Sequence, residues 1–211
     1  MARILITSGP TRQYLDPVRY LTNASSGRMG RALAAAALEG GHEVIVVSGP
    51  VDLRYPDGAE VVSVVSTEDM LDACLAEFPR CDGLIGVAAP CDYRPVQVST
   101  QKIAKTGEPL MLHLVETADI VAALGTIKQL QWMVAFALET EDVRMRAMQK
   151  LERKNCDMIV LNGPAAIHAA DTQVEIIDRS GNSVAHLAGG KEMVAQGIFR
   201  VIEERLIRHF P

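Results

Sequence analysis

Short apolar runs alternate along this chain with longer helix-like stretches, and this alternation constrains the fold more than any other feature. The runs at residues 3–9, 43–50, 60–66, 82–89, 132–139 and 156–163 predict strands, and those at residues 30–41, 67–78, 117–127 and 141–155 predict helices. The near-continuous apolar run at 82–89 is typical of a strand covered on both faces. The pattern therefore predicts an α/β fold with a parallel sheet and helices on both of its faces.

Other segments depart from this rhythm. Residues 90–109 are polar and contain three prolines, which predicts a long loop that is either functional or mobile. A short strand is possible at residues 110–116. Residues 172–188 predict a β-hairpin, and residues 190–210 predict a closing amphipathic helix. A length of 211 residues predicts a single domain over 1–211.

Composition excludes several classes of protein. A net charge of −5 argues against general nucleic-acid binding, which usually needs a basic face. The four cysteines lack metal-ligand spacing, so we expect reduced thiols and no metal site among them. No apolar run approaches the length of a membrane span. We therefore expect a cytoplasmic protein that binds neither nucleic acid nor membrane.

Ligands of open α/β sheets bind beyond the carboxyl ends of the strands. The segments that fall there are residues 9–30, residues 48–50, residues 88–93 and Glu139. Within the first of them, Gly27 and Gly30 open a predicted helix. Their backbone N–H groups suit a phosphate, but close packing of helix on strand explains the glycines equally well. A dinucleotide fingerprint is disfavoured, because the glycines are too widely spaced and no acidic residue ends the second strand.

Several polar side chains near these ends suit an anionic ligand. Lys102 and Lys105 lie in the polar loop, and Lys150 and Lys154 share one face of a predicted helix. Each lysine is equally explained by solvation or by the helix dipole. Asp92 follows a strand and suits either a ribose or a turn.

Longer motifs are more specific. The segment "ILITSGPTRQYLDPVRYLTNASSGRMG" is followed by "AAPCDYRP", "QKIAK", "ADIVAALG", "VAFALET" and "KLERKNCDMIVLN". Together these motifs resemble the phosphopantothenate–cysteine ligases, also called phosphopantothenoylcysteine synthetases. In bacteria this domain is usually the C-terminal half of a bifunctional coenzyme A flavoprotein. The resemblance covers about four fifths of the chain and implies a Rossmann-like fold.

The resemblance also implies a reaction and its partners. Such ligases join 4′-phosphopantothenate to cysteine through an acyl-cytidylate, using CTP and Mg²⁺. They typically form homodimers. Since the sequence contains no flavoprotein half, we expect a separate decarboxylase flavoprotein to act on the product.

Site residues follow by matching positions. The resemblance implies catalytic roles for Asn23, Arg19 and Lys102. It implies nucleotide binding by Gly86, Val87, Ala88, Asp92, Lys102, Lys105, Asp119, Phe136, Lys150 and Lys154. It places substrate binding at Ser25, Ser26, Gly27 and Gly30. No protein side chain is assigned to a metal.

Some positions depart from the family pattern. A Lys-Asn-Pro-Asp-Ile segment common in the family is here Glu116–Ile120, and the usual Ala-Asn-Asp is Leu161-Asn162-Gly163. These departures leave open whether CTP or ATP is used. Two other functions stay open, an NAD(P)-dependent oxidoreductase and a non-catalytic nucleotide-binding paralogue.

Overall fold

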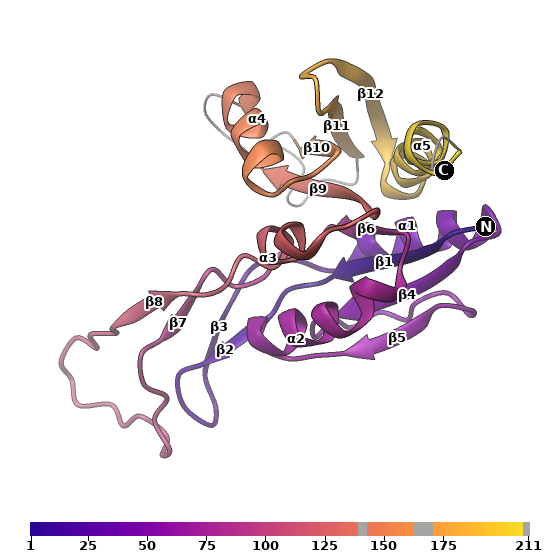
Figure 1. Cartoon of the computed structure of the whole chain (residues 1–211). Coiled ribbons are helices and arrows are strands. Elements are labelled where there is room, and N and C mark those ends of the chain that lie inside the picture. Colours follow the sequence, from indigo (N-terminus) through magenta and orange to yellow (C-terminus); the bar gives the residue numbers. More distant parts are fainter. Residues whose placement is uncertain (139–142, 163–170, 209–211) are drawn as a thin grey trace.

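The centre of the molecule is a mixed eight-stranded sheet, in the order β12-β11-β10-β9-β6-β1-β4-β5 (Figure 1). The computed structural model describes residues 1–138, 143–162 and 171–208. The strands of this sheet are β1 (Arg3–Ser8), β4 (Glu43–Ser48), β5 (Glu60–Ser63), β6 (Gly83–Gly86), β9 (Trp132–Leu138), β10 (Met158–Asn162), β11 (Asp171–Asp178) and β12 (Ser183–Gly190).

Strand direction divides this sheet into two parts. The strands from β5 to β10 run parallel, and β11 and β12 form an antiparallel hairpin at one edge. The predicted parallel sheet and C-terminal hairpin are therefore confirmed. The hairpin continues the sheet, which makes it mixed.

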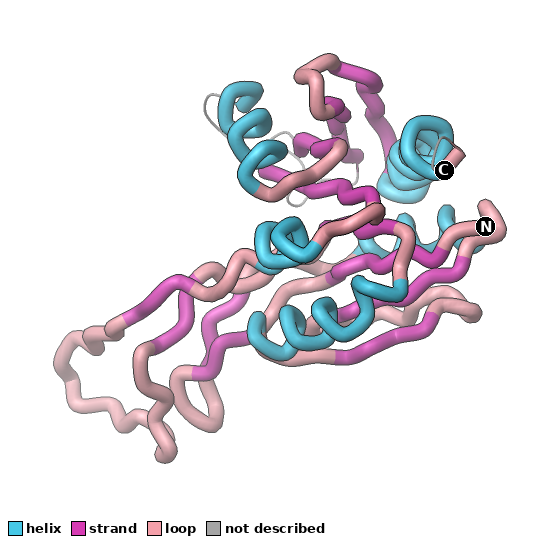
Figure 2. The backbone as a smooth tube through the Cα atoms, in the orientation of Figure 1, coloured by secondary structure: helices cyan, strands magenta, loops and turns pink. Residues whose placement is uncertain are grey.

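Helices cover both faces of the sheet (Figure 2). One face packs against α1 (Arg28–Glu39) and α5 (Lys191–Ile202), and the other against α2 (Thr67–Glu77), α3 (Ile120–Ile127) and α4 (Val143–Arg153). Neighbouring residues of a strand point to opposite faces, so Ile4 and Ile6 enter one core and Leu5 the other. Both cores bury Ile, Val, Leu and Ala side chains, which explains the continuous apolar runs in the sequence.

Local sequence signals set several helix ends. A run of alanines with Leu33 and Leu38 favours α1 over other structure, and Gly40 follows its last residue. Ser66 caps α2, because its hydroxyl accepts a hydrogen bond from the Asp69 amide at 3.0 Å while the Asp69 carboxylate accepts one from the Ser66 amide at 2.8 Å. The closing helix ends as a π-helical turn at Glu203–Ile207.

Two short hairpins project from the sheet body beyond the carboxyl end of β1 (Figure 1). β2 (Arg12–Tyr14) pairs with β3 (Tyr20–Thr22), and β7 (Tyr93–Pro95) pairs with β8 (Leu114–Glu116). We call residues 12–22 the first arm and residues 93–116 the second arm; β2 lies beside β7. The sequence predicted loops at both places, with a possible strand over 110–116. β8 is shorter than the predicted strand, and it pairs with β7 rather than with a strand of the main sheet.

Two further properties follow from the fold. Within residues 1–138, 143–162 and 171–208, no helix has the length and apolar character that crossing a membrane requires. All four cysteines are buried free thiols, as predicted. Burial raises the pKa of Cys74 and of Cys156 to about 12, so neither is a thiolate at neutral pH.

Candidate active site

The strand order reverses at β1. The chain continues from β1 to β4 on one side of β1, and it later returns to form β6 on the other side. A crevice at such a reversal is the usual ligand site of this kind of sheet. Here the loops after β1 and β6 are joined, because the Ala89 amide donates to the Gly9 carbonyl at 2.9 Å. The loop after β4 also comes close, since a Cβ on Gly49 would lie 1.7 Å from the Pro10 carbonyl oxygen.

One cavity lies where the loop before α1 meets the end of β6. Its volume is about 300 Å³, and we call it the glycine-side cavity. It is lined by Ala24, Ser25, Ser26, Gly27, Arg28, Met29, Gly30, Val87, Ala88, Ala89, Phe136, Ala137, Asn162, Thr172 and Lys191. All four residues predicted to bind substrate are therefore brought together here.

Gly27 and Gly30 have geometric reasons to be glycine. Gly27 has a φ of 72°, a left-handed conformation that glycine adopts easily. A Cβ on Gly30 would lie 2.1 Å from the Ser8 hydroxyl, so this residue lets α1 approach β1. Close packing of α1 on β1 thus explains Gly30. The same turn also places the start of α1 beside a cavity.

A second cavity lies on the other side of the β6 end. Its volume is about 560 Å³, and we call it the lysine-side cavity. It is lined by Thr7, Gly86, Ala88, Pro90, Asp92, Tyr93, Glu116, Thr117, Ala118, Asp119, Ile120, Val121, Phe136, Arg153 and Lys154. Ala88 and Phe136 line both cavities, so ligands in the two would meet over these residues.

Most of the predicted nucleotide-binding residues line the lysine-side cavity. These are Gly86, Ala88, Asp92, Asp119, Phe136 and Lys154, whereas Val87 lines the glycine-side cavity. Lys150 lies on α4, the helix that ends at Arg153, but it does not line the lysine-side cavity. Lys102 and Lys105 are exposed on the second arm, away from the lining of both cavities. Glu139 lies outside the described residues.

An ion-pair cluster gives the lysine-side cavity its charge. Asp119 caps α3 by accepting from the Ala122 amide at 3.1 Å, and it also lies 3.0 Å from the Lys154 ammonium and 3.4 Å from Arg153. Burial alone would raise the pKa of Asp119, but Lys154 and the hydrogen bonds outweigh burial and lower it. Arg153 and Lys154 thus face this cavity with the Asp119 carboxylate between them, and two further carboxylates, Asp92 and Glu116, also line it.

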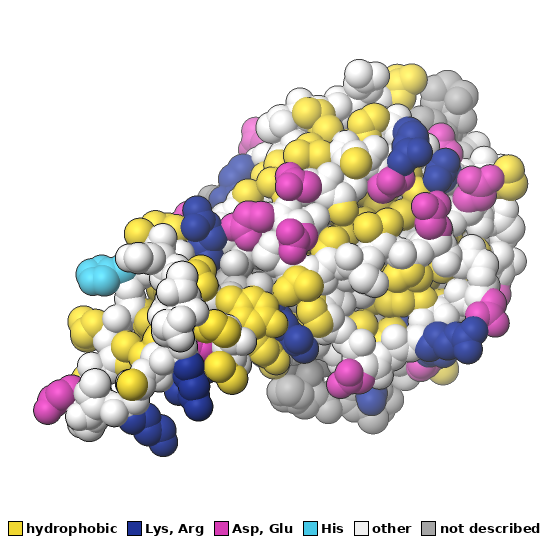
Figure 3. Space-filling model, turned by 90° about the horizontal axis from the view of Figure 1, so that it is seen from below, with side chains coloured by type: hydrophobic (Ala, Val, Ile, Leu, Met, Phe, Trp, Pro, Cys, Tyr) yellow, Lys and Arg dark blue, Asp and Glu magenta, His cyan; other side chains and the backbone are white. Residues whose placement is uncertain are grey.

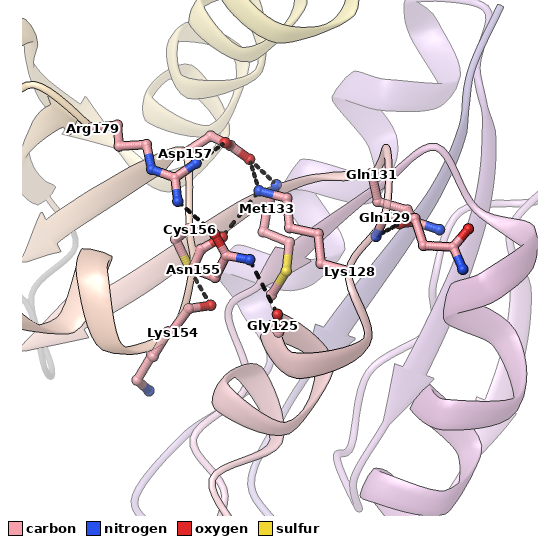
Figure 4. Close-up of polar contacts among 10 residues, drawn as sticks. All are labelled: Gly125, Lys128, Gln129, Gln131, Met133, Lys154, Asn155, Cys156, Asp157 and Arg179. Carbon is pink, nitrogen blue, oxygen red and sulfur yellow. Dashed lines mark hydrogen bonds and ion pairs between the residues drawn. The ribbon is translucent and has the colours of Figure 1, made fainter.

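A partly buried network of polar contacts holds the turn that carries Lys154 (Figure 4). Asn155 has a φ of 52°, and its side-chain amide donates to the Gly125 carbonyl at 3.2 Å. Lys128 donates to the Asn155 carbonyl at 3.0 Å and to the Asp157 carboxylate at 2.7 Å. Because a Cβ on Gly125 would lie 2.2 Å from the Lys154 carbonyl oxygen, α3 and this turn are in direct backbone contact.

Asn23 joins the opening loop to the end of β6. Its side-chain amide donates to the Pro90 carbonyl at 2.8 Å and contacts the Ala89 carbonyl at 3.4 Å. It also lines a third cavity of about 510 Å³ with Arg12, Arg28 and Lys191. Pro50, from the predicted segment after the second strand, lines this third cavity too.

Arg19 connects the two arms. Its guanidinium donates to the Asp16 carboxylate at 2.6 Å and to the Ile103 carbonyl at 3.0 Å. Asp16 is fully buried and also accepts from the Ile103 amide at 3.1 Å. Burial would raise the pKa of Asp16, but hydrogen bonds from the Val18, Ile103 and Arg19 amides and from the Arg19 side chain lower it to about 2. This pair therefore ties the second arm, which carries Lys102, to the first.

Sequence reasoning missed four residues at this site. They are Asp16, Arg28, Arg153 and Lys191. Arg28 lies inside the opening motif and could have been found by asking why a basic residue starts a helix. Asp16 also lies inside the opening motif, but its contact with Ile103 is distant in sequence, and Lys191 gave no signal because its neighbours at the site are distant in sequence.

Together, the reversing sheet and the adjoining cavities define a Rossmann-like ligand-binding domain. The chain belongs to the family described as the DNA/pantothenate metabolism flavoprotein C-terminal domain, whose model matches residues 1–206. The family-level resemblance predicted from the motifs is therefore confirmed.

Individual relatives agree with this assignment. The coenzyme A biosynthesis bifunctional protein CoaBC of Haemophilus influenzae is 37% identical over 204 residues, which cover 95% of this chain and 51% of that protein. A protein named cysteine/cysteine sulfinic acid decarboxylase, from an unknown prokaryotic organism, is 43% identical over 206 residues, 95% of this chain and 57% of that protein. The chain thus spans about half the length of these relatives.

A solved structure matches as well. The crystal structure of the C-terminal domain of a CoaBC protein superimposes with a TM-score of 0.83 at 38% identity. The match covers 98% of this chain and 96% of that domain, so the whole fold described above is shared.

Proposed function

We propose that this chain joins 4′-phosphopantothenate to cysteine through an acyl-nucleotide intermediate, as a ligase of coenzyme A biosynthesis. The name of its CoaBC relative and its fold match to a CoaBC C-terminal domain support this class. The observation that carries the proposal is the pair of cavities that share Ala88 and Phe136. A ligase needs such an arrangement, because the reacting groups of two ligands must meet.

The proposed reaction has two steps. A carboxylate oxygen of phosphopantothenate attacks the nucleotide α-phosphorus, and pyrophosphate leaves. The cysteine amine then attacks the activated carbonyl carbon, forming the amide and releasing the nucleoside monophosphate. Activation is needed because a free carboxylate has no good leaving group. The protein contributes orientation and charge neutralisation to both steps.

Residues of this chain take the following proposed roles. Lys154 and Arg153 neutralise nucleotide phosphates in the lysine-side cavity, where they already face Asp119. Asn23 fixes the opening loop against the end of β6 by donating to the Pro90 carbonyl, and its proposed place is beside the acyl-nucleotide intermediate. Lys102 approaches from the second arm to neutralise charge that develops during activation.

The proposed cosubstrate is CTP, with ATP as the alternative, together with Mg²⁺. Mg²⁺ is usually held by one or two carboxylates and the phosphates of the substrate. Asp92 fits this requirement, because it lines the lysine-side cavity and makes no ion pair with a described residue. When bound, the ion would neutralise phosphate charge.

A second copy of the chain is the proposed protein partner. Exposed apolar side chains gather on the two arms, in the part that projects in Figure 3. They are Tyr14, Val18, Tyr20, Tyr93, Val96, Val98, Leu110, Met111, Leu112, Leu114 and Val115. A monomer rarely exposes a patch of this extent, and homodimers commonly bury such surfaces. Sedimentation analysis checks this, and a monomer at micromolar concentration contradicts it.

A nucleotide panel tests the ligase activity. Purified chain is mixed with phosphopantothenate, cysteine, Mg²⁺ and either CTP, ATP, GTP or UTP, and pyrophosphate and the amide product are measured. We expect pyrophosphate release that requires phosphopantothenate, with one nucleotide strongly preferred. No release with any nucleotide would overturn the proposal. Release of CO₂ from cysteine without nucleotide would point instead to the decarboxylase activity named in one relative.

A further inference from the structure

The turn that ends α4 carries Lys154 and has a residue in a left-handed conformation. The Asn155 amide donates to the Glu152 carbonyl at 3.1 Å, and the Cys156 amide donates to the Leu151 carbonyl at 3.0 Å. With Asn155 at a φ of 52°, these two bonds form a Schellman motif, whose left-handed residue is usually glycine and sometimes asparagine. Glycine would suit this turn at least as well, so its conformation does not explain what the Asn155 side chain contacts.

The Asn155 side chain joins this turn to two other elements (Figure 4). Its amide donates at 3.2 Å to the Gly125 carbonyl in the last turn of α3, where a helix has no amides left to pair its carbonyls. Its side-chain oxygen accepts from the guanidinium of Arg179, which lies in the turn between β11 and β12. Since Lys128 also donates to the Asn155 backbone carbonyl at 3.0 Å, the turn is bonded on several sides.

The sheet holds the same turn from below. The Asp157 amide donates to the Met133 carbonyl at 2.8 Å, and the Asp157 carboxylate accepts from the Met133 amide at 2.8 Å and from Lys128 at 2.7 Å. The turn is therefore tied to β9. Asn155, Lys128 and Asp157 do not line the lysine-side cavity, so a ligand there would contact Lys154 but not these residues that hold it.

This turn determines where the Lys154 ammonium lies. Its backbone packs on one end of α3, because a Cβ on Gly125 would lie 2.2 Å from the Lys154 carbonyl oxygen. Its ammonium lies 3.0 Å from Asp119 at the other end of α3. The Lys154 side chain is only 16% exposed, whereas that of the neighbouring Arg153 is 66% exposed. A shift of the turn would therefore move the Lys154 ammonium relative to the cavity wall.

We infer that Asn155 is a positioning residue, whose side chain holds Lys154 at the wall of the lysine-side cavity and so raises the affinity of that cavity for an anionic ligand. The inference rests on the proposed function, in which Lys154 neutralises nucleotide phosphates. Ordering a long side chain on binding costs conformational entropy, and a lysine whose backbone is already fixed loses less of it. Asn155 thus acts on the ligand through Lys154, without touching the ligand.

Pyrophosphate binding tests the inference without turnover. Pyrophosphate is titrated calorimetrically, with Mg²⁺ present, into the wild type and into Asn155→Gly and Arg179→Gln. Asn155→Gly permits the left-handed turn and removes both side-chain contacts, so the chain should stay folded. We expect its affinity for pyrophosphate to fall about fivefold, and that of Arg179→Gln to fall less, because only one contact with Asn155 is lost.

Arg144→Gln is the matched control. Arg144 also joins α4 to the turn between β11 and β12, by donating to the Gly181 carbonyl, but it lies at the opposite end of α4 from Lys154. This variant loses one positive charge and one hairpin contact, as Arg179→Gln does, and should bind pyrophosphate like the wild type. In turnover assays, Asn155→Gly should raise the KM for the nucleotide at unchanged kcat, whereas a merely structural role would lower only the Tm.

A double-mutant cycle shows whether Asn155 acts through the lysine. In a Lys154→Gln background, Asn155→Gly should cause no further loss of pyrophosphate affinity. Additive losses, or wild-type affinity in a folded Asn155→Gly variant, would overturn the inference and leave the proposed role of Lys154 standing. Wild-type affinity in Lys154→Gln would overturn both. Coupled losses in a chain without ligase activity would support the positioning role while the proposed function fails.

Discussion

The sheet body and the two arms are held by different forces. In the body, strands and helices bury apolar side chains in two cores, and polar groups such as Lys128 and Asp157 are paired. In the arms, apolar side chains are largely exposed, and one buried carboxylate, Asp16, connects the two hairpins. The difference indicates that body residues determine most of the stability, whereas exposed arm residues, unlike Asp16, can change activity or assembly at little cost in stability.

The largest loss of stability is expected from Trp132→Ala, at the start of β9. Trp132 is 2% exposed, and a Cβ on the neighbouring Gly83 would lie 2.0 Å from its ring. The Trp132 ring therefore fills space that truncation to Ala would leave as a cavity. We expect a loss of about 4 kcal/mol in the free energy of unfolding, measured by urea denaturation. Leu130→Ala is the control, since Leu130 is 74% exposed and should change stability by less than about 0.5 kcal/mol.

A smaller loss is expected from Lys128→Gln, which tests the polar part of the body. Removing this ammonium leaves Asp157 with the Met133 amide and a weaker contact to Arg179 at 3.6 Å. We expect a loss of about 2 kcal/mol, because one partner of a mostly buried ion pair is removed. Urea denaturation measures it. A stability equal to the wild type would show that the body does not depend on this pair.

Asp16→Asn tests the connection between the two arms, because the effect of this substitution on stability should depend on pH. The pKa of Asp16 falls from 3.8 to about 2 on folding, so its ionised form favours the folded arms. This contribution is fully present above pH 4 and is lost as the pH falls toward 2. The difference in Tm between the wild type and Asp16→Asn should therefore be constant above about pH 4 and narrow below it.

The same variant has a matched control. Asp57→Asn changes a carboxylate whose side chain is 90% exposed and which contacts Arg54 rather than either arm, so hydrogen exchange at residues 99–103 should stay as in the wild type. Hydrogen exchange should also be faster at residues 99–103 in Asp16→Asn than in the wild type, because the Ile103 amide loses its charged acceptor. A Tm difference that stays constant down to pH 2 would contradict this account of the arms.

The smallest effect on stability is expected from Lys102→Gln. Lys102 is exposed on the second arm and should change the free energy of unfolding by less than about 0.5 kcal/mol. Its proposed role in activation predicts a fall in kcat of about tenfold or more. Comparison with Lys128→Gln then shows whether the arm lysine affects kcat and the body lysine affects the free energy of unfolding. Turnover equal to the wild type would remove Lys102 from the mechanism.

Sequence reasoning reached the body more easily than the arms. The parallel strands were predictable because burial on both faces demands long apolar runs. The three-residue strands of the arms are too short to show periodicity, and Asp16 meets Ile103 from 87 residues away. The resemblance implied a catalytic role for Arg19, and the motif gave no sign that its guanidinium pairs with Asp16 and reaches the second arm at Ile103. Long-range polar contacts such as these leave no local pattern.

Ala88 and Phe136 line both cavities at the end of β6, but the other walls come from separate segments of the chain. Of these two cavities, residues 24–30 and Lys191 line only the glycine-side cavity, and residues 116–121 line only the lysine-side cavity. Under the proposed function, a substitution in one of these segments alters the wall of one cavity and leaves the wall of the other unchanged. On that proposal, preference for each ligand can change in separate evolutionary steps, while the shared wall at Ala88 and Phe136 stays the same.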